Sequence, residues 1–207
     1  MTDTPFSYND HVTVGTSSEA AEWVRNSSLR PECKEAHLRL ISRFPTQSFT
    51  REDNALLDYR EAIDSISVPA WMRAARTTLS GFGSAFAVRF DSIGQASPRA
   101  DYVQDIWYTW ELASWDEEIR GILRDGMRVY PLADLRESLN SYLAIDLTNP
   151  DDDQIYEFSY LSAVDNWSMD EPLRDVMFPA FSSYCDMISH IVAVQTTDGS
   201  VVDADEG

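Results

Sequence analysis

The chain has 207 residues and a formal net charge of −19, which comes from 35 carboxylates against 16 basic side chains. Its hydrophobic fraction of 43%, with six Trp, nine Tyr and nine Phe, excludes a disordered protein and predicts a packed globule. A negative field of this size repels nucleic acid and anionic membranes and attracts basic partners, although acidity also keeps a small protein soluble.

Two cysteines, Cys33 and Cys185, are too few for a disulfide framework. Cys185 lies in a helical pattern after an aromatic residue, which favours a buried free thiol over a disulfide bond. The opening MTDTPFSYND lacks the basic segment and the apolar run of a signal peptide. No stretch approaches the roughly eighteen apolar residues of a membrane span. We therefore expect a reducing, cytoplasmic compartment.

We expect residues 1–49 to form an N-terminal extension with one or two short helices. The first fifteen residues are polar and irregular. A helical stretch then opens at Ser17 and ends by Pro31, with possible core contacts from Ala20, Ala21, Trp23 and Val24. A second helix begins at Pro31 and ends before Pro45, and its inward residues are Leu38, Leu40 and Ile41.

Two better-marked helices follow. The segment from Thr50 to Asp53 resembles a capping box with Asp in place of Glu, and the residues at helical spacing after it are Leu56, Leu57, Tyr59 and Ile63. Another helix begins at Ser67-Val68-Pro69, because proline suits the first helical position. Its apolar face holds Trp71, Met72, Ala75 and Leu79, and Gly81 is a natural residue just past its end.

From Ser84 the pattern changes from helix to strand. Alternation predicts strands at SAFAVRF (84–90), MRVYPL (127–132), SYLAIDL (141–147) and QIYEFSY (154–160), of which the last two form a hairpin. Helices are predicted over 111–123 and, to close the domain, over about 179–194. This order predicts an α+β domain over residues 50–194, followed by an acidic flexible tail at 195–207.

The run from Asp146 to Glu157 does not fit a metal loop. An EF-hand needs alternating oxygen donors and a central glycine, whereas Pro150 stiffens this segment and no glycine occurs in it. Zinc needs nitrogen and sulfur donors at close spacing, but neither CxxC nor HExxH occurs and the histidines are isolated: His11, His37 and His190. We expect no metal and no cofactor.

Motifs for enzymatic chemistry are weak. Gly81–Phe86 (GFGSAF) lacks the third glycine of a nucleotide loop, and it joins a helix to a strand, where a phosphate cradle needs the reverse order. No GxSxG elbow occurs, and no local Cys–His or Ser–His pair is suggested. Hydrolysis by two carboxylates needs only the right separation, and 35 acids nominate no particular pair. We expect a protein without catalytic activity, with a carboxylate-dependent hydrolase as the remote alternative.

Four short segments resemble the SUKH superfamily, the Smi/Knr-type domain widespread among bacterial immunity proteins. They are SISVPAWMRAARTTLSGFG, RVYPLADL, SYLAIDL with its Ile145-Asp146-Leu147 triplet, and QIYEFSY with the later AFSSYCDMISHI. The resemblance spans about residues 50–194, and the first 49 residues have no counterpart. Two features depart from the family pattern: Arg136–Asn140 replaces an expected Gly-Gly-Asp, and a Pro-Asp-Asp-Asp turn replaces a simpler hairpin.

The resemblance implies a small twisted antiparallel sheet with helices packed at its ends and on one face. It also implies binding without catalysis, which in many members neutralises a toxin delivered by neighbouring cells. The favoured function is therefore an immunity protein, and the alternative is a regulatory or scaffold protein of the same fold with an endogenous partner. The oligomeric state stays open.

The charge of the chain and the family resemblance point to the same segment, residues 140–175. It holds nine carboxylates and a single basic residue, Arg174. Nuclease toxins bind phosphate and are basic, so an inhibitor can present an acidic surface in place of the substrate. Complementary charge speeds encounter, and a few aromatic residues supply affinity. Trp167 is the expected anchor, with help from Tyr156 or Tyr160. The predicted partner-binding residues are Asp151, Asp152, Asp153, Glu157, Asp165, Trp167, Asp170 and Glu171.

Blander interpretations of the same residues stay open. Asn-Pro-Asp-Asp is ordinary turn chemistry, so Asp151–Asp153 can be a solvated turn without a partner. Asp146 can be structural, accepting a hydrogen bond from a nearby backbone donor. Trp167 can pack beneath the loop that follows the hairpin.

Overall fold

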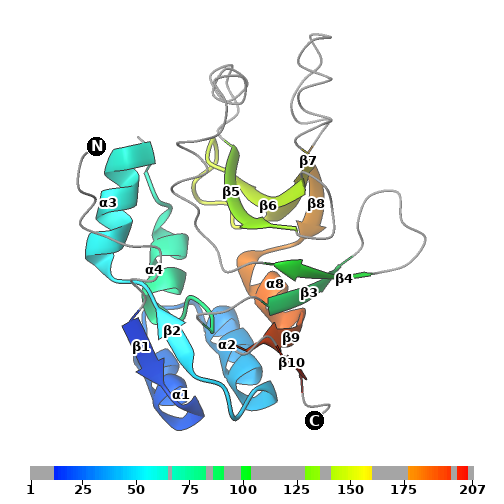
Figure 1. Cartoon of the computed structure of the whole chain (residues 1–207). Coiled ribbons are helices and arrows are strands. Elements are labelled where there is room, and N and C mark those ends of the chain that lie inside the picture. The colour runs from blue at the N-terminus through cyan, green and yellow to red at the C-terminus, as the bar shows by residue number, and fades with distance from the viewer. Residues whose placement is uncertain are drawn as a thin grey trace, which may run out of the picture.

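The computed structural model describes residues 12–64, 67–82, 86–90, 99–103, 129–135, 141–159, 177–196 and 200–204. Within them, helices combine with small antiparallel sheets, which confirms the α+β class (Figure 1). No helix of these ranges is long and apolar enough to cross a membrane. The helix predicted over 111–123 lies outside the described residues.

The N-terminal helices lie where the sequence predicts them. Helix α1 spans Ser17–Asn26 and α2 spans Pro31–Arg43. A capping box fixes the start of α1, where the backbone N–H of Thr16 donates to Oε2 of Glu19 at 2.8 Å. Just before it, Gly15 has a φ of +118°, and a Cβ there would lie 2.2 Å from the same oxygen. Only glycine fits this entry into the helix.

Two strands flank this helix pair. Strand β1 (Val12–Gly15) pairs antiparallel with β2 (Phe49–Arg51), with both helices between them in the chain. The expectation of an irregular start was therefore wrong for residues 12–15. A local pattern misses such a strand because its partner lies beyond two helices.

Helix α3 (Asn54–Asp64) begins later than predicted. Thr50 belongs to β2 and caps nothing, so the predicted capping box was wrong. Instead, Oδ1 of Asp53 accepts a hydrogen bond from the backbone N–H of Ala55 at 3.0 Å. This bond satisfies one of the free donors at the start of the helix.

Helix α4 (Ala70–Thr78) follows, with Pro69 as its N-cap and Leu79 as its C-cap. Gly81 therefore lies two residues after the C-cap and not directly after it, as the sequence predicted. It has a φ of +154° and forms an isolated antiparallel bridge with Thr50 of β2. The glycine serves this bridge rather than the end of the helix.

The remaining strands form two antiparallel sheets of four strands each in the described residues (Figure 1). One has the order β10-β9-β3-β4, with bounds Val201–Asp203, Ile191–Gln195, Phe86–Phe90 and Arg99–Val103. The other has the order β5-β6-β7-β8, with bounds Val129–Asp134, Ser141–Asp146, Ile155–Ser159 and Met177–Phe181. The pairing of β6 with β7 confirms the predicted hairpin.

The predicted closing helix over 179–194 was wrong. Strand β8 continues to Phe181, helix α8 covers only Tyr184–Ser189, and β9 begins at Ile191. The β-branched run that starts at Ile191 pairs with β3 on one side and β10 on the other. Strand β10 lies within the segment expected to be a flexible tail, so at least residues 201–203 are ordered by pairing.

One apolar cluster joins the N-terminal helices, both four-stranded sheets and α8. It includes Val24 and Leu40 from the N-terminal helices together with Ile145 of β6, Tyr184 of α8 and Ile191 of β9. Residues 17–43 therefore share a core with both four-stranded sheets and α8. The inward residues predicted for these helices are confirmed, with the exception of Trp23, which is 45% exposed. The guanidinium carbon of Arg51 lies over the Trp23 ring, 5.1 Å from the centre of that ring.

Candidate functional site

The turn between β6 and β7, residues 146–153, carries the run of aspartates and is called the acidic turn below. Two of its carboxylates fix the backbone. Oδ1 of Asp146 accepts hydrogen bonds from the N–H and the hydroxyl of Thr148, at 2.8 and 2.6 Å. Oδ1 of Asp152 accepts from the N–H of Gln154 at 3.0 Å. These local bonds are the ordinary chemistry of aspartate in turns, and they hold this one in a defined shape.

The carboxylates of the acidic turn point in different directions. Asp151 and Asp152 are exposed, whereas Asp153 is only 9% exposed and Glu157, on β7, is 5% exposed. Glu157 alternates with Tyr156 and lies on the inward side with Ile155, as the period of a strand requires. The prediction that Asp153 and Glu157 contribute to an exposed surface was therefore wrong.

The other predicted binding residues cannot be placed. Asp165, Trp167, Asp170 and Glu171 lie outside the described residues, as does Tyr160. Their proposed contribution to a surface stays a prediction. Of the predicted set, the structure brings together Asp151, Asp152 and Asp153 on one turn, with Tyr156 beside them.

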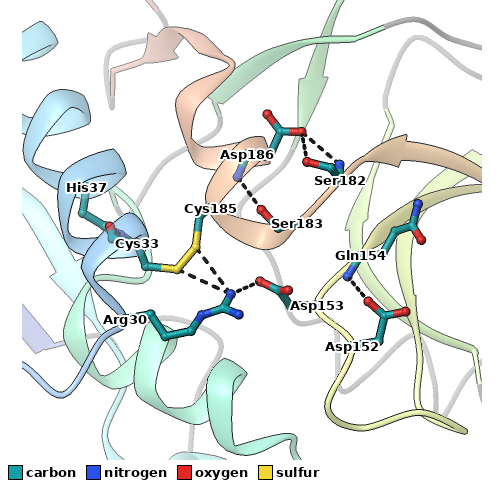
Figure 2. Close-up of polar contacts among 10 residues, drawn as sticks. All are labelled: Arg30, Cys33, His37, Asp152, Asp153, Gln154, Ser182, Ser183, Cys185 and Asp186. Carbon is teal, nitrogen blue, oxygen red and sulfur yellow. Dashed lines mark hydrogen bonds and ion pairs between the residues drawn. A yellow bond between two sulfur atoms is a disulfide. The ribbon is translucent and has the colours of Figure 1, made fainter.

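Asp153 turns inward because it forms an ion pair with Arg30, the residue that precedes α2 (Figure 2). The two residues are 123 positions apart in the chain. The side chain of Arg30 is 52% exposed and that of Asp153 is 12% exposed, so the pair lies at the border between core and solvent. The ion pair anchors the acidic turn to the N-terminal helices.

The same guanidinium group contacts two sulfur atoms. Cys33 on α2 and Cys185 on α8 form a disulfide, with their Cα atoms 5.0 Å apart, so the prediction of a free thiol was wrong. Nη2 of Arg30 lies 3.9 Å from Sγ of Cys33 and 3.8 Å from Sγ of Cys185 (Figure 2). We call Arg30, Cys33, Asp153 and Cys185 the Arg30 cluster.

Sequence reasoning missed this cluster because Arg30 lies 123 residues from Asp153 and 155 residues from Cys185 in the chain. The only available signal was the presence of two cysteines, each on a predicted helix. What brings them together is the packing of α2 against α8, which no local pattern encodes.

A serine cap sets the start of α8 and hence the place of Cys185. The hydroxyl of Ser183 accepts a hydrogen bond from the N–H of Asp186 at 3.0 Å, and the carboxylate of Asp186 accepts from the N–H and hydroxyl of Ser182 at 2.9 and 2.8 Å (Figure 2). Such reciprocal bonds satisfy the free donors of the first helical turn. The cap fixes Cys185 one residue into the helix.

Two titratable side chains report the electrostatics around the turn and the cluster. The pKa of Tyr156 is raised, first by burial and then by the charges of Asp152 and Asp146. The pKa of His37 is lowered because burial disfavours the charged imidazole, and this effect outweighs the opposing hydrogen bonds of the ring with the backbone of Cys33 and Leu79. The acidic turn thus carries a negative potential, while the core beside Cys33 holds a neutral imidazole.

Within the described ranges, no group of three or more His, Cys, Asp or Glu side chains is placed to hold a metal ion. The site offers two exposed carboxylates, those of Asp151 and Asp152, on a turn of defined shape. Through Asp153 and Arg30 this turn is connected to the disulfide. Comparisons of the chain with models of protein families, with curated proteins and with solved structures gave no match. The resemblance to the SUKH superfamily therefore stays a prediction.

Proposed function

We propose that this chain is a non-catalytic module that binds a basic protein, with the acidic turn as the part of its surface that makes first contact. The observation that carries the proposal is the exposure of Asp151 and Asp152 on a turn whose backbone is already fixed. Preorganised charge reduces the entropy lost on binding. The net charge of −19 adds a long-range field of the same sign.

Within this class, we favour an immunity protein that acts in the cytoplasm and neutralises a basic toxin, above all a nuclease. The support is the charge of the chain and its resemblance to the SUKH superfamily. A nuclease surface that binds phosphate is complementary to two adjacent carboxylates, each of which can accept hydrogen bonds from arginine or lysine. A regulatory or scaffold protein with an endogenous basic partner is the alternative.

The test compares variants that lose the same charge at different places. Asp151→Asn with Asp152→Asn removes two charges from the acidic turn, while Glu22→Gln with Asp203→Asn removes two from exposed positions on α1 and β10. Asp153 is left intact because its ion pair anchors the turn. Association rates are measured by surface plasmon resonance against purified basic nuclease domains, at low and at moderate salt.

We expect wild type to bind at least one domain of the panel, with an association rate that falls as salt rises. The variant of the acidic turn should associate about tenfold more slowly at low salt, whereas the control variant should change by about twofold or less. Equal slowing in both variants would mean that only net charge matters. Absence of binding across the panel would oppose the nuclease proposal.

A further inference from the structure

We propose that the Cys33–Cys185 disulfide is a reversible redox switch that acts through Arg30 on how firmly the acidic turn is held. Nη2 of Arg30 contacts both sulfur atoms and also forms the ion pair with Asp153. One guanidinium nitrogen therefore connects the sulfur pair to the turn.

The position of the pair suits reversible chemistry. The two cysteines are 5% and 7% exposed, and the group beside them, Arg30, has a side chain that is half exposed. The cluster thus lies just beneath the surface. A nearby arginine lowers the pKa of a cysteine from its ordinary value of about 8.5, while apolar burial raises it. The direct contact with Arg30 favours the thiolate over the thiol.

The chemical step is a two-electron reduction. A small dithiol breaks the Sγ–Sγ bond, its electrons and protons convert Cys33 and Cys185 into two thiols, and the dithiol leaves as its cyclic disulfide. One of the new thiols then loses a proton to solvent and becomes the thiolate that Arg30 stabilises. Oxidation by a disulfide-containing compound reverses these steps.

Reduction changes what Arg30 holds. In the disulfide form the guanidinium faces two neutral sulfur atoms and one anion, the carboxylate of Asp153. In the reduced form a thiolate and Asp153 compete for the same nitrogen, and the two anions repel each other. The ion pair at the base of the acidic turn is then weakened, and residues 151–155 become more mobile.

Other charged groups near the switch come from each element packed around it. His37 on α2 is buried, and its Nδ1 donates to the carbonyl of Cys33 at 2.7 Å. The carboxylate of Asp186, on α8, accepts hydrogen bonds from Ser182 and contacts the imidazole of His190. Lys34 on α2 donates to the carbonyl of Arg25. Unlike these groups, Arg30 contacts both sulfur atoms, so it is the group to vary.

The first measurement is the titration of the reduced protein by its thiolate absorbance near 240 nm. We expect one thiolate to appear about one pH unit or more below the ordinary cysteine value. Arg30→Gln should move that titration upward by about one unit, since the stabilising charge is gone. Arg39→Gln is the matched control, because Arg39 lies on the same helix and pairs with Glu35. Ordinary titration in wild type, or no effect of Arg30→Gln, overturns the proposal.

The second measurement is amide hydrogen exchange of the full chain with the disulfide formed and after reduction by dithiothreitol, with circular dichroism as the check on folding. We expect exchange in residues 151–155 to become about fivefold faster or more on reduction, with little change in α1. Asp153→Asn should exchange fast in both states, because its link to Arg30 is already absent. Unchanged exchange at the turn, or loss of the whole fold on reduction, overturns the switch.

The regulatory meaning of the switch rests on the proposed function, since a more mobile turn matters only if the turn binds a partner. The coupling itself is measured without a partner, so the two proposals fail separately. If the turn responds to reduction but no basic protein binds, the switch stands and the proposed function falls. If a basic protein binds equally well to both redox states, the function stands and the switch has no role in it.

Discussion

The guanidinium of Arg76 lies 2.6 Å from the carboxylate of Glu52, and both side chains are almost completely buried. The backbone of the two residues is also joined, since the N–H of Glu52 donates to the carbonyl of Arg76 at 2.9 Å. A second nitrogen of Arg76 donates to the carbonyl of Ser80. This pair therefore ties the segment between β2 and α3 to helix α4.

Removing one member of this pair should destabilise the protein strongly. Arg76→Met leaves the carboxylate of Glu52 buried without its cation, and such a loss costs about 3–5 kcal/mol in the free energy of unfolding. Glu52→Gln should act in the same direction. Urea denaturation gives the free energy of unfolding for each variant. Glu35→Gln breaks an exposed pair with Arg39 and should cost only about 0.5 kcal/mol. Similar small losses at both sites would contradict this account.

The buried imidazole of His37 should make stability fall at mildly acidic pH. Its pKa is lowered in the folded state because burial disfavours the charged form. In the unfolded chain it takes up a proton near pH 6.5, so the unfolded state gains a proton that the folded state does not. This contribution to stability is present above that pH and is lost as pH falls, with a slope of up to about 1.4 kcal/mol per pH unit.

The measurement is urea denaturation from about pH 7.5 down to about pH 5, across the unfolded pKa of histidine. Below about pH 6.5, His37→Gln should reduce the slope of the unfolding free energy against pH by the equivalent of up to one bound proton. This holds whatever the substitution does to the stability at neutral pH. Ser42→Ala, at an exposed position of the same helix without a titratable side chain, is the control and should keep the wild-type slope. A slope that survives in His37→Gln would assign it to other groups.

Two aromatic residues near β2 should differ sharply in their importance. Phe49 is fully buried and its ring lies 5.2 Å from that of Phe82, so Phe49→Ala should cost about 3–5 kcal/mol. Trp23→Ala removes an exposed ring and its contact with Arg51, and should cost about 1 kcal/mol or less. Melting temperatures of both variants test this order. A large loss for Trp23→Ala would contradict this order.

Tyr156 can report the potential of the acidic turn. Its pKa is raised by burial and by the charges of Asp152 and Asp146. Asp152→Asn should therefore lower the pKa of the phenol, because one of those charges is lost. Nuclear magnetic resonance of tyrosine labelled with carbon-13 at Cζ follows the nine tyrosines, and Tyr156→Phe identifies the signal of Tyr156. Asp58→Asn, on α3, is the matched control and should leave the titration unchanged.

Local patterns were sufficient for much of the fold. The hairpin of β6 and β7 follows from alternation on both sides of a turn-forming aspartate run, and α1 and α2 follow from apolar spacing bounded by proline. The segment after Pro179 misled the prediction, since its apolar residues fit a helix as well as a strand. The run Ile191–Val194 favoured β structure by its β-branched residues, and pairing with β3 decided the outcome.

The site was only partly predictable for the same physical reason. The aspartates of the acidic turn are visible in the sequence, and so is their tendency to fix a turn. Which of them points outward depends on Arg30, a partner 123 residues away, and on the packing of α2 against α8. Long-range contacts of this kind leave no periodic signal.

The packing of α2 on the C-terminal elements also bears on the order in which the protein can fold during synthesis. Arg43, at the end of α2, donates to the carbonyl oxygens of Ser189 and Ile191, which are made 146 and 148 residues later. The ribosome adds residues one by one, and contacts of such separation form slowly because a long loop must close first. Helix α2 therefore leaves the ribosome with its apolar side uncovered. Until the C-terminal elements have been made, a chaperone that binds exposed apolar surface can bind to α2.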